Sequence, residues 1–293
     1  MSAAAARVPA RRHYRRRRLF TEAGSAILGL ILLIWTLLPI YNMFLIALDP
    51  EEGEVEFTGN IFPPEPSLDA FGVVLTQDDR YLAQFWQQFG NSLYIGVLTM
   101  VLTLVIASLA SFAVGRMRLG KGRWLTGAAL LTYAVPAALL AIPFYRAMHS
   151  YGLTDSPWAV IAAQVTLASP FAILILRHYA TLIPVELDDA ARIDGATGAR
   201  RFVHVTFPLL ANLYLVCTLL STLWTVGDFN TVYFVSNGAP ALSTDVLATL
   251  GFRYTFDGIK PELGLAAMMS ALPVLIPIVI IMVRRLHTRE VQL

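Results

Sequence analysis

Long apolar segments separated by short polar ones dominate the chain. A helix that crosses the hydrocarbon core of a bilayer needs about 20 consecutive, mostly apolar residues. Segments of this kind occupy residues 24–48, 89–114, 123–148, 158–180, 209–235 and 262–284. The first follows an arginine-rich stretch, but it is too long for the core of a signal peptide and lacks a convincing cleavage site, so we expect it to be retained. The pattern predicts an all-α integral membrane protein with six transmembrane helices.

The composition agrees with a membrane protein. Of the 293 residues, 56% are hydrophobic and 14% are charged, whereas charged residues make up about 25% of typical soluble domains. The chain has one cysteine, Cys217. A single thiol can form neither an internal disulfide nor a cysteine-rich metal site, so we expect Cys217 to be a small lipid-facing or packing residue.

The positions of the basic residues predict the orientation of the six helices. Eighteen of the 22 lysines and arginines lie before the first segment, between the second and third, around the connection from fourth to fifth, or at the end of the sixth. With six spans these regions share one side, and an excess of basic residues marks the cytoplasmic side. Both termini are therefore predicted to be cytoplasmic. We divide the chain into a basic tail (1–23), a transmembrane domain (24–286) and a short second tail (287–293).

The connection from the fourth to the fifth segment is unusually polar. Residues 184–210 read PVELDDAARIDGATGARRFVHVTFPLL, which predicts two short helices joined by a sharp turn. Pro184 suits a first helical position, and acidic residues near a helix start are favoured by the helix dipole. Gly195 is predicted to end the first helix in a left-handed conformation, and Thr197 to cap a second helix that runs to Pro208. One side of the first helix carries Leu187, Ala190, Ala191 and Asp194, so we interpret this stretch as a docking element.

The same stretch resembles a known motif. Ala190 and Ala191 are followed after three residues by Gly195, and after nine more by Val205, Phe207 and Pro208. This spacing resembles the EAA motif of membrane subunits in bacterial ATP-binding-cassette (ABC) importers, and DDAARIDGAT is similar to the version found in carbohydrate importers. Asp189 stands at the motif's glutamate, Val205 at its isoleucine and Phe207 at its leucine. Other segments, such as NSLYIGVLT and VPAALLAIPFYRAMHSYGLTDS, look like the sugar-permease pattern in the same order.

The resemblance implies a type I ABC importer permease fold in which the loop 181–208 is a coupling loop that contacts an ATPase. The coupling residues implied are Glu186, Leu187, Asp189, Ala190, Ala191, Asp194, Gly195, Ala196 and Pro208. It also implies a multi-pass protein of the bacterial plasma (inner) membrane, surrounded by lipid and without a nucleic-acid partner. The implied partners are a second permease subunit in a heterodimer, two cytoplasmic ATPase subunits, an extracytoplasmic solute-binding protein and a sugar substrate.

No sequence feature predicts an enzyme. The stretch GRMRLGKG at 115–122 has the glycine and lysine spacing of a phosphate-binding loop, but Gly122 replaces the Ser or Thr that would hold magnesium. The stretch also follows an apolar helix where such a loop follows a strand. We therefore expect no catalytic residue, cofactor or metal site in this chain, and ATP and magnesium to be bound by the partner ATPases.

Polar residues inside the predicted spans are candidates for solute contact, because they are unfavourable in lipid unless they face a cavity or another helix. The sequence predicts a substrate pathway that includes Asn91, Gln164, Asp228 and Asn230. If the fifth span starts near Leu209, Asp228 lies about 28 Å along it, towards the outer interface. A hydrogen bond between helices is the competing interpretation for the asparagines and the glutamine, and a structural role is the alternative to a pathway or gate role for Asp228. Five prolines in the spans are expected to kink their helices: Pro136, Pro143, Pro170, Pro273 and Pro277.

Two alternatives to a sugar importer remain from the sequence. The first is an ABC importer permease for another solute, such as a peptide, an amino acid or a phosphate compound. The second is a stand-alone carrier or channel with six spans, which would need charged relays or inverted repeats. The spans contain one clear acid, Asp228, and no such repeat.

Overall fold

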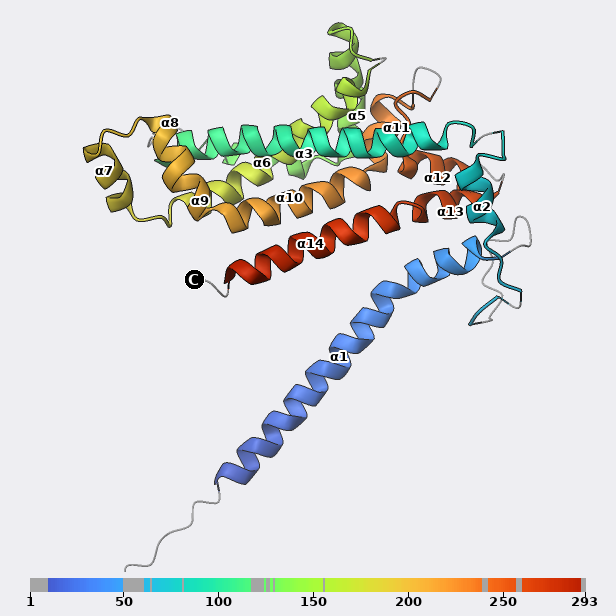
Figure 1. Cartoon of the computed structure of the whole chain (residues 1–293), viewed down its shortest axis with the longest axis horizontal. Coiled ribbons are helices and arrows are strands. Elements are labelled where there is room, and N and C mark those ends of the chain that lie inside the picture. The colour runs from blue at the N-terminus through green and yellow to red at the C-terminus, as the bar shows by residue number, and fades with distance from the viewer. Residues whose placement is uncertain are drawn as a thin grey trace, which may run out of the picture.

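The computed structural model describes residues 10–49, 61–63, 65–80, 82–116, 124, 127–128, 130–154, 156–238, 242–256 and 260–290 (Figure 1). Within these residues the regular structure is entirely helical and contains no strand, which confirms the all-α prediction. Residues 117–122 of the phosphate-loop-like stretch, and the ends 1–9 and 291–293, lie outside the described residues.

The helices have the following bounds in chain order: α1 (Ala10–Ala47), α2 (Asp69–Thr76), α3 (Phe85–Arg116), the 3₁₀ helix η1 (Leu131–Ala134), α5 (Ala137–Ser150), α6 (Pro157–Ala180), α7 (Val185–Ile193), α8 (Gly198–Arg201), the π-helix η2 (Phe202–Thr206), α9 (Phe207–Leu209), α10 (Ala211–Val226), α11 (Phe229–Val235), α12 (Leu247–Phe256), α13 (Pro261–Met269) and α14 (Leu272–Glu290).

Four helical segments of the described chain are long and apolar enough to cross a membrane: Thr21–Ala47, Phe85–Gly115, Pro157–Ala180 and Pro261–His287. They correspond to the first, second, fourth and sixth predicted spans. A fifth candidate is the pair Gly198–Leu209 and Ala211–Val226, which are bent by 76° relative to each other. The structure therefore supports up to five of the six predicted spans by length and composition.

The fifth predicted span, 209–235, is wrong as a single helix. Helix α10 ends at Val226, and α11 begins at Phe229 after a break at Gly227 and Asp228. Asp228 accepts a hydrogen bond from the backbone N–H of Thr231 at 3.1 Å, as a side chain at a helix start commonly does. The break has a local cause, because an acidic N-cap favours a new helix at this point.

The predicted third span, 123–148, is interrupted in its described part. Helix η1 ends before Val135, which has an extended backbone (φ −97°, ψ 122°), and α5 begins after Pro136. A proline disfavours helical geometry in the residue before it and lacks the N–H of a helical hydrogen bond. The expected kink at Pro136 is therefore present as a complete break.

Helix α3 is the centre of the bundle and packs against both α6 and α10, while α14 packs against α10. A buried cluster joins α3, α6 and α10 and contains Ala107, Ala172, Leu176, Leu210, Tyr214 and Cys217. The small residues let the helices approach closely, as is common in membranes. Cys217 is 6% exposed within this cluster, in agreement with its predicted packing role.

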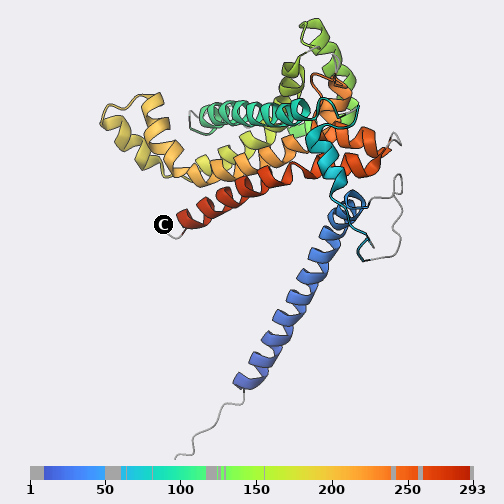
Figure 2. The ribbon, with the colours of Figure 1, turned by 45° about the vertical axis from the view of Figure 1, so that its right-hand side comes forward.

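The two ends of the bundle differ. One end gathers α2, α12 and α13 with the adjoining ends of α1 and α3, around buried Phe85 and Leu250. The opposite end carries α7, α8 and α9 (Figures 1 and 2). The described parts of the connections between the first and second predicted spans and between the fifth and sixth thus meet at one end, and the polar loop lies at the other.

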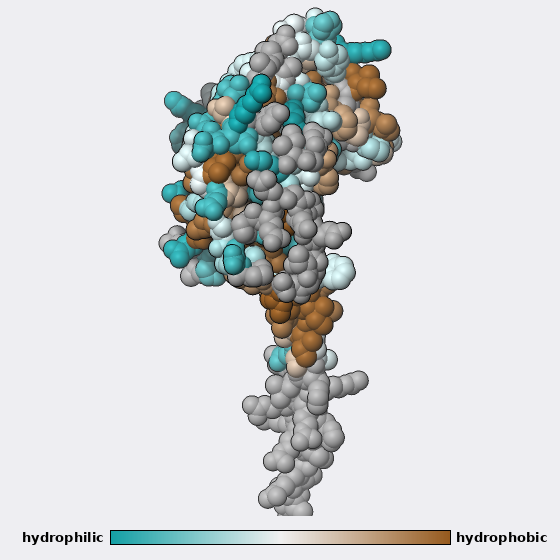
Figure 3. Space-filling view, turned by 90° about the vertical axis from the view of Figure 1, so that its right-hand side faces the viewer, coloured by the Kyte–Doolittle hydropathy of each residue, from teal (hydrophilic) through white to brown (hydrophobic). Residues whose placement is uncertain are grey.

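Helix α1 extends away from the bundle (Figures 1 and 2). No residue in its most apolar window is buried, and Trp35 is 76% exposed. Figure 3 shows hydrophobic side chains on this protruding part below the end that carries α2 and α12. A surface this apolar is suited to contact with lipid or with another membrane helix.

Candidate functional site

The turn after α7 has the geometry of a Schellman motif. The N–H of Ala196 donates to the carbonyl of Ala191 at 2.9 Å, and the N–H of Gly195 donates to that of Arg192 at 3.0 Å. Gly195 has a φ of +78°, and a Cβ added there would meet no atom within 4 Å. The prediction that Gly195 ends the helix in a left-handed conformation is confirmed. A larger side chain at this position would be disfavoured by backbone conformation and not by crowding.

The second part of the loop begins as predicted. Thr197 is the N-cap of α8, and its hydroxyl accepts a hydrogen bond from the N–H of Arg200 at 3.4 Å. The helix then continues through the π-turn η2 and through Pro208 to Leu209, so it ends within a residue of the predicted end. Pro184 is the N-cap residue of α7 and Val185 is its first helical residue, so the helix begins one position later than predicted.

Aromatic side chains connect this loop to the bundle. The ring of Phe202 lies 5.6 Å from that of Phe112 in α3 and 6.3 Å from that of Phe207. Phe207 in turn lies 4.9 Å from Tyr214 in α10. The four rings form a continuous row, which we call the aromatic row. A displacement of α8–α9 would therefore be transmitted to α3 and α10 by direct contact.

The predicted coupling residues lie on the surface of the loop. Ala191 and Ala196 are partly exposed, and Leu187 is 43% exposed. The remaining members of the predicted set are exposed, namely Glu186, Asp189, Ala190, Asp194, Gly195 and Pro208. Ile193 is 87% exposed at the end of α7, although it was not in the predicted set. Acidic and apolar side chains are thus presented together at one end of the molecule.

Two of the predicted pathway residues contact each other. Gln164 of α6 donates from Nε2 to Oδ2 of Asp228 at 3.0 Å, and its Oε1 accepts from Thr99 Oγ1 of α3 at 3.0 Å. Gln164 is 5% exposed. Its side chain therefore joins two helices to the break between α10 and α11, which agrees with the competing interpretation of these polar residues as bonds between helices.

Asn91 and Asn230 do not join this network. Asn91 donates from Nδ2 to the carbonyls of Ser243 at 2.7 Å and of Asp245 at 2.9 Å. Asn230 is exposed on α11. The four predicted pathway residues are therefore separated: Gln164 and the partly buried Asp228 form a pair, Asn91 binds the backbone before α12, and Asn230 lies on the surface.

The sequence analysis missed a buried polar cluster around Asp245, at the end that carries α12. Asp245 is fully buried, and its Oδ2 accepts from Arg253 Nη1 at 2.9 Å and from Gln88 Nε2 at 3.1 Å. Thr249 donates to the other carboxylate oxygen. Asp245 lies outside the candidate spans, and burial raises the pKa of its carboxyl, while the Thr249 hydrogen bond and the Arg253 charge act in the opposite direction. Thr249 and Arg253 are close to Asp245 in the sequence, but Gln88 lies 157 positions away, so spacing could not predict that α3 completes this cluster.

Further contacts hold the connection before α3 against the same end. Tyr254 donates to Asp79 Oδ1 at 3.1 Å, and Lys260 Nζ lies 3.7 Å from Asp79 Oδ2. An acidic hollow of about 200 Å³ lies beside them, with Asp69 and Asp78 in its lining. The described residues before α3 are thus packed against α12 and the start of α13.

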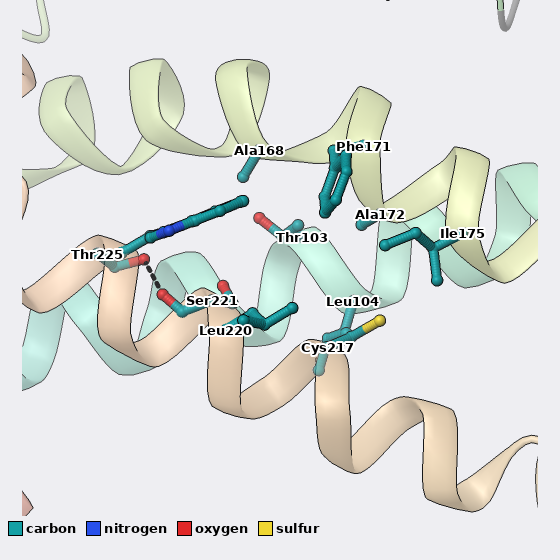
Figure 4. Close-up of a pocket in the computed structure, with 11 residues that line it drawn as sticks. Thr103, Leu104, Ala168, Phe171, Ala172, Ile175, Cys217, Leu220, Ser221 and Thr225 are labelled. Carbon is teal, nitrogen blue, oxygen red and sulfur yellow. Dashed lines mark hydrogen bonds between the residues drawn. The ribbon is translucent and has the colours of Figure 1, made fainter. Parts of the chain in front are cut away.

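A pocket lies where α3, α6 and α10 meet (Figure 4). Thr103 comes from α3, Phe171 from α6, and Cys217, Ser221 and Thr225 from α10. The Thr225 hydroxyl donates to the backbone carbonyl of Ser221 at 2.6 Å. No residue of the lining carries a formal charge, so the pocket suits an uncharged group.

Comparison with known proteins finds a family profile that matches more than half of this chain. Residues 104–291 match the profile of the family described as "Binding-protein-dependent transport system inner membrane component". The chain is 26% identical over 261 residues to the diacetylchitobiose uptake system permease protein DasC of Streptomyces coelicolor, an alignment that covers 89% of this chain and 92% of DasC. It is 28% identical over 255 residues to the trehalose transport system permease protein SugB of Mycobacterium tuberculosis, covering 87% and 89% of the two chains.

The fold is also similar to a solved structure. A chain of a bacterial ABC transporter involved in the import of the acidic polysaccharide alginate superimposes with a TM-score of 0.71 at 22% sequence identity. The superposition covers 90% of this chain and 96% of that one.

Proposed function

Because the chain belongs to the family of inner membrane components of binding-protein-dependent transport systems, we propose that it forms half of the pathway through which an ATP-driven importer moves a sugar or sugar-like solute. Members of this family are multi-pass subunits of the bacterial plasma membrane and are not enzymes, so the predictions of localisation and of a non-enzymatic role are confirmed. The type I importer permease fold is supported by the similarity to the alginate transporter.

The proposed cargo follows from the relatives. The relatives DasC and SugB are named for the uptake of diacetylchitobiose and the transport of trehalose. The similar solved structure belongs to a transporter involved in the import of alginate. All three are carbohydrates. A sugar or an oligosaccharide is therefore the solute class that we assign to this chain, and the alternative of a non-sugar cargo becomes an outcome of the transport assay.

A permease of this family works with other subunits. We propose that the partners are a second, different permease chain, two cytoplasmic ATPases that bind ATP and magnesium, and an extracytoplasmic binding protein. The exposed apolar surface of α1 is consistent with a neighbouring membrane subunit, because a helix with no buried residue in its apolar window needs lipid or protein around it.

The loop 181–208 is the proposed contact with an ATPase. The observation that carries this assignment is the aromatic row from Phe112 to Tyr214, which links an exposed loop to two helices of the bundle. Movement of a docked ATPase would displace α7–α9, and the attached α6 and α10 would change the accessibility of the pathway. The tails 1–23 and 287–293 are assigned to the same cytoplasmic side, with the transmembrane domain 24–286 between them.

Co-expression with the neighbouring transport genes tests the proposal. We expect the chain to co-purify with an ATPase and a second permease, and the reconstituted complex to accumulate trehalose or diacetylchitobiose only with ATP and the binding protein. Asp189→Lys reverses the charge near the start of α7, so it should reduce co-purification of the ATPase, while Asp189→Asn should retain most of it. Sugar accumulation that is driven by a proton gradient without an ATPase would favour the stand-alone carrier instead.

A further inference from the structure

The pocket between α3, α6 and α10, shown in Figure 4, lies near the middle of α3 and α6 along their lengths. Ala168 in its lining is at the middle of α6, and Thr103 lies within one turn of the middle of α3. Other classes of transporter bind their solutes near the midplane of the membrane. The depth of the pocket therefore suits a group that binds during passage.

Two hydroxyl groups of this pocket lack a protein partner. Thr103 is 2% exposed and Ser221 is 8% exposed, and neither Thr103 Oγ1 nor Ser221 Oγ has a hydrogen-bond partner among the residues that the structure describes. Buried hydroxyls are nearly always paired, because an unpaired one loses the hydrogen bonds that it makes in water. A partner that enters the pocket would satisfy both groups.

Other hydroxyls on the same helices show that pairing is readily achieved. On α10, Thr218 Oγ1 donates to the carbonyl of Tyr214 at 2.7 Å. On α3, Ser111 Oγ donates to the carbonyl of Ser108 at 3.0 Å. Thr103 and Ser221 differ from these neighbours because both line the pocket. They therefore differ from hydroxyls such as those of Thr218 and Ser111, which form hydrogen bonds within their own helix.

The rest of the lining indicates the chemical class of the ligand. The rings of Phe171 and Trp224 lie 5.6 Å apart, and Trp224 is 56% exposed. Aromatic faces bind apolar C–H surfaces, while hydroxyls bind other hydroxyls. A sugar ring presents both kinds of surface and carries no charge. A lipid acyl chain would fill the apolar part but could not pair with Thr103 or Ser221.

The pocket is also placed where the coupling loop can change its size. Helices α6 and α10 both pack on α3, and the segment α7–α9 joins their ends. The volume of the pocket in this conformation is about 40 Å³, whereas one water needs about 10–15 Å³ on such a measure. The pocket can therefore admit a hydroxymethyl group or the edge of a ring. Separation of α6 from α10 would enlarge it.

We propose that this pocket is a transient sugar-binding subsite of the pathway. Thr103 and Ser221 would hydrogen-bond to solute hydroxyls, and Trp224 would cover an apolar face of the ring. The proposal rests on the proposed function and assigns solute contact to residues other than Asn91, Gln164, Asp228 and Asn230.

Removal of the two hydroxyls tests the subsite in the reconstituted complex with saturating binding protein. Thr103→Val and Ser221→Ala should each lower the maximal uptake of trehalose or diacetylchitobiose about two- to tenfold, the range expected for loss of one neutral hydrogen bond. The yield of assembled complex and its ATPase activity should remain unchanged. Ser111→Ala and Thr218→Val are matched controls, because they remove hydroxyls of the same helices that already pair with the backbone. Wild-type uptake in both pocket variants would overturn the subsite.

Cys217, the one cysteine of the chain, lines the pocket and allows a second measurement. The rate at which N-ethylmaleimide modifies Cys217, followed by mass spectrometry of its peptide, should fall in the presence of the transported sugar. A sugar that is not transported should have no effect. If the rate of Cys217 modification changes with the lipid composition of the membrane and not with the sugar, the pocket binds lipid and the proposal is wrong.

The two measurements separate the subsite from the proposed function. A complex that transports sugar normally, with unaffected pocket variants and no protection of Cys217, refutes the subsite alone. A wild-type complex that transports no sugar refutes both.

Discussion

Gln164 of α6 donates a hydrogen bond to Asp228 at the break between α10 and α11, with 3.0 Å between Nε2 and Oδ2. The second oxygen of Asp228 accepts from the backbone of Thr231, and Gln164 accepts from Thr99. One pair of side chains thus connects three parts of the bundle. Both residues have protein partners, so their polarity does not by itself indicate contact with solute.

Asp228→Ala should lower the stability of the complex. It removes the N-cap of α11, worth about 1 kcal/mol, and it deprives the buried Gln164 amide of an acceptor, which costs about 1–3 kcal/mol. Asp228→Asn retains an acceptor oxygen for the cap and should be milder. Thermal unfolding of the purified complex measures the difference. Asn230→Ala, at an exposed position two residues later, is the control and should be neutral. Loss of transport by Asp228→Ala with wild-type stability would instead indicate a role in the pathway.

Gly195→Val should uncouple ATP hydrolysis from transport. The φ of +78° at Gly195 costs a residue with a Cβ about 1–2 kcal/mol, so valine would redirect α8 while the membrane helices stay in place. Gly195→Asn should be better tolerated because asparagine adopts this conformation more readily. The ratio of sugar transported to ATP hydrolysed is the measurement.

Gly198→Ala provides the matched control for Gly195. Gly198 lies in the first turn of α8, and an added Cβ would have only the end of the Arg201 side chain within 4 Å, at 3.9 Å. Alanine should therefore leave the coupling ratio unchanged. If Gly195→Val and Gly198→Ala change the ratio of sugar transported to ATP hydrolysed by the same amount, the left-handed turn at Gly195 is not needed for coupling.

Arg253 and Asp245 should respond unequally to substitution. Arg253→Met leaves the buried Asp245 carboxylate without its cation, and breaking a buried pair in this way costs about 3–5 kcal/mol. Asp245→Asn leaves Arg253, whose side chain is 24% exposed, partly in contact with water, and should therefore cost less. The double variant Arg253→Met, Asp245→Asn should regain part of the stability lost in Arg253→Met.

Limited proteolysis of the complex would rank the stability of the three variants, with the rate of cleavage between α11 and α12 as the readout. Equal stability of the two single variants would contradict the asymmetry.

The orientation of the chain can be tested with cysteines in a Cys217→Ser background. Ile61→Cys replaces a side chain that is 83% exposed at the α2 end, and it should react with a membrane-impermeant maleimide in intact cells. Ala199→Cys, in the exposed loop at the opposite end, should react only after the membrane is opened. Labelling of Ala199→Cys in intact cells would reverse the topology and exclude the coupling role.

The sequence by itself determined the features that depend on local chemistry and on periodic pattern. Apolar length identified the helices at 21–47, 85–115, 157–180 and 261–287. The turn at Gly195 and the cap at Thr197 were predictable because each depends on residues within one or two helical turns.

Features that depend on distant partners were decided only by the tertiary structure. The apolar length of residues 209–235 favoured one continuous helix, but Asp228 caps a new helix at the Thr231 N–H and also binds Gln164, a partner 64 positions away that the sequence did not indicate. Asp245 meets Gln88 across 157 positions of sequence. Thr103 and Ser221 come together only because α3 and α10 pack side by side. A hydrogen bond between helices depends on their relative position and rotation, which the order of residues along one helix does not specify.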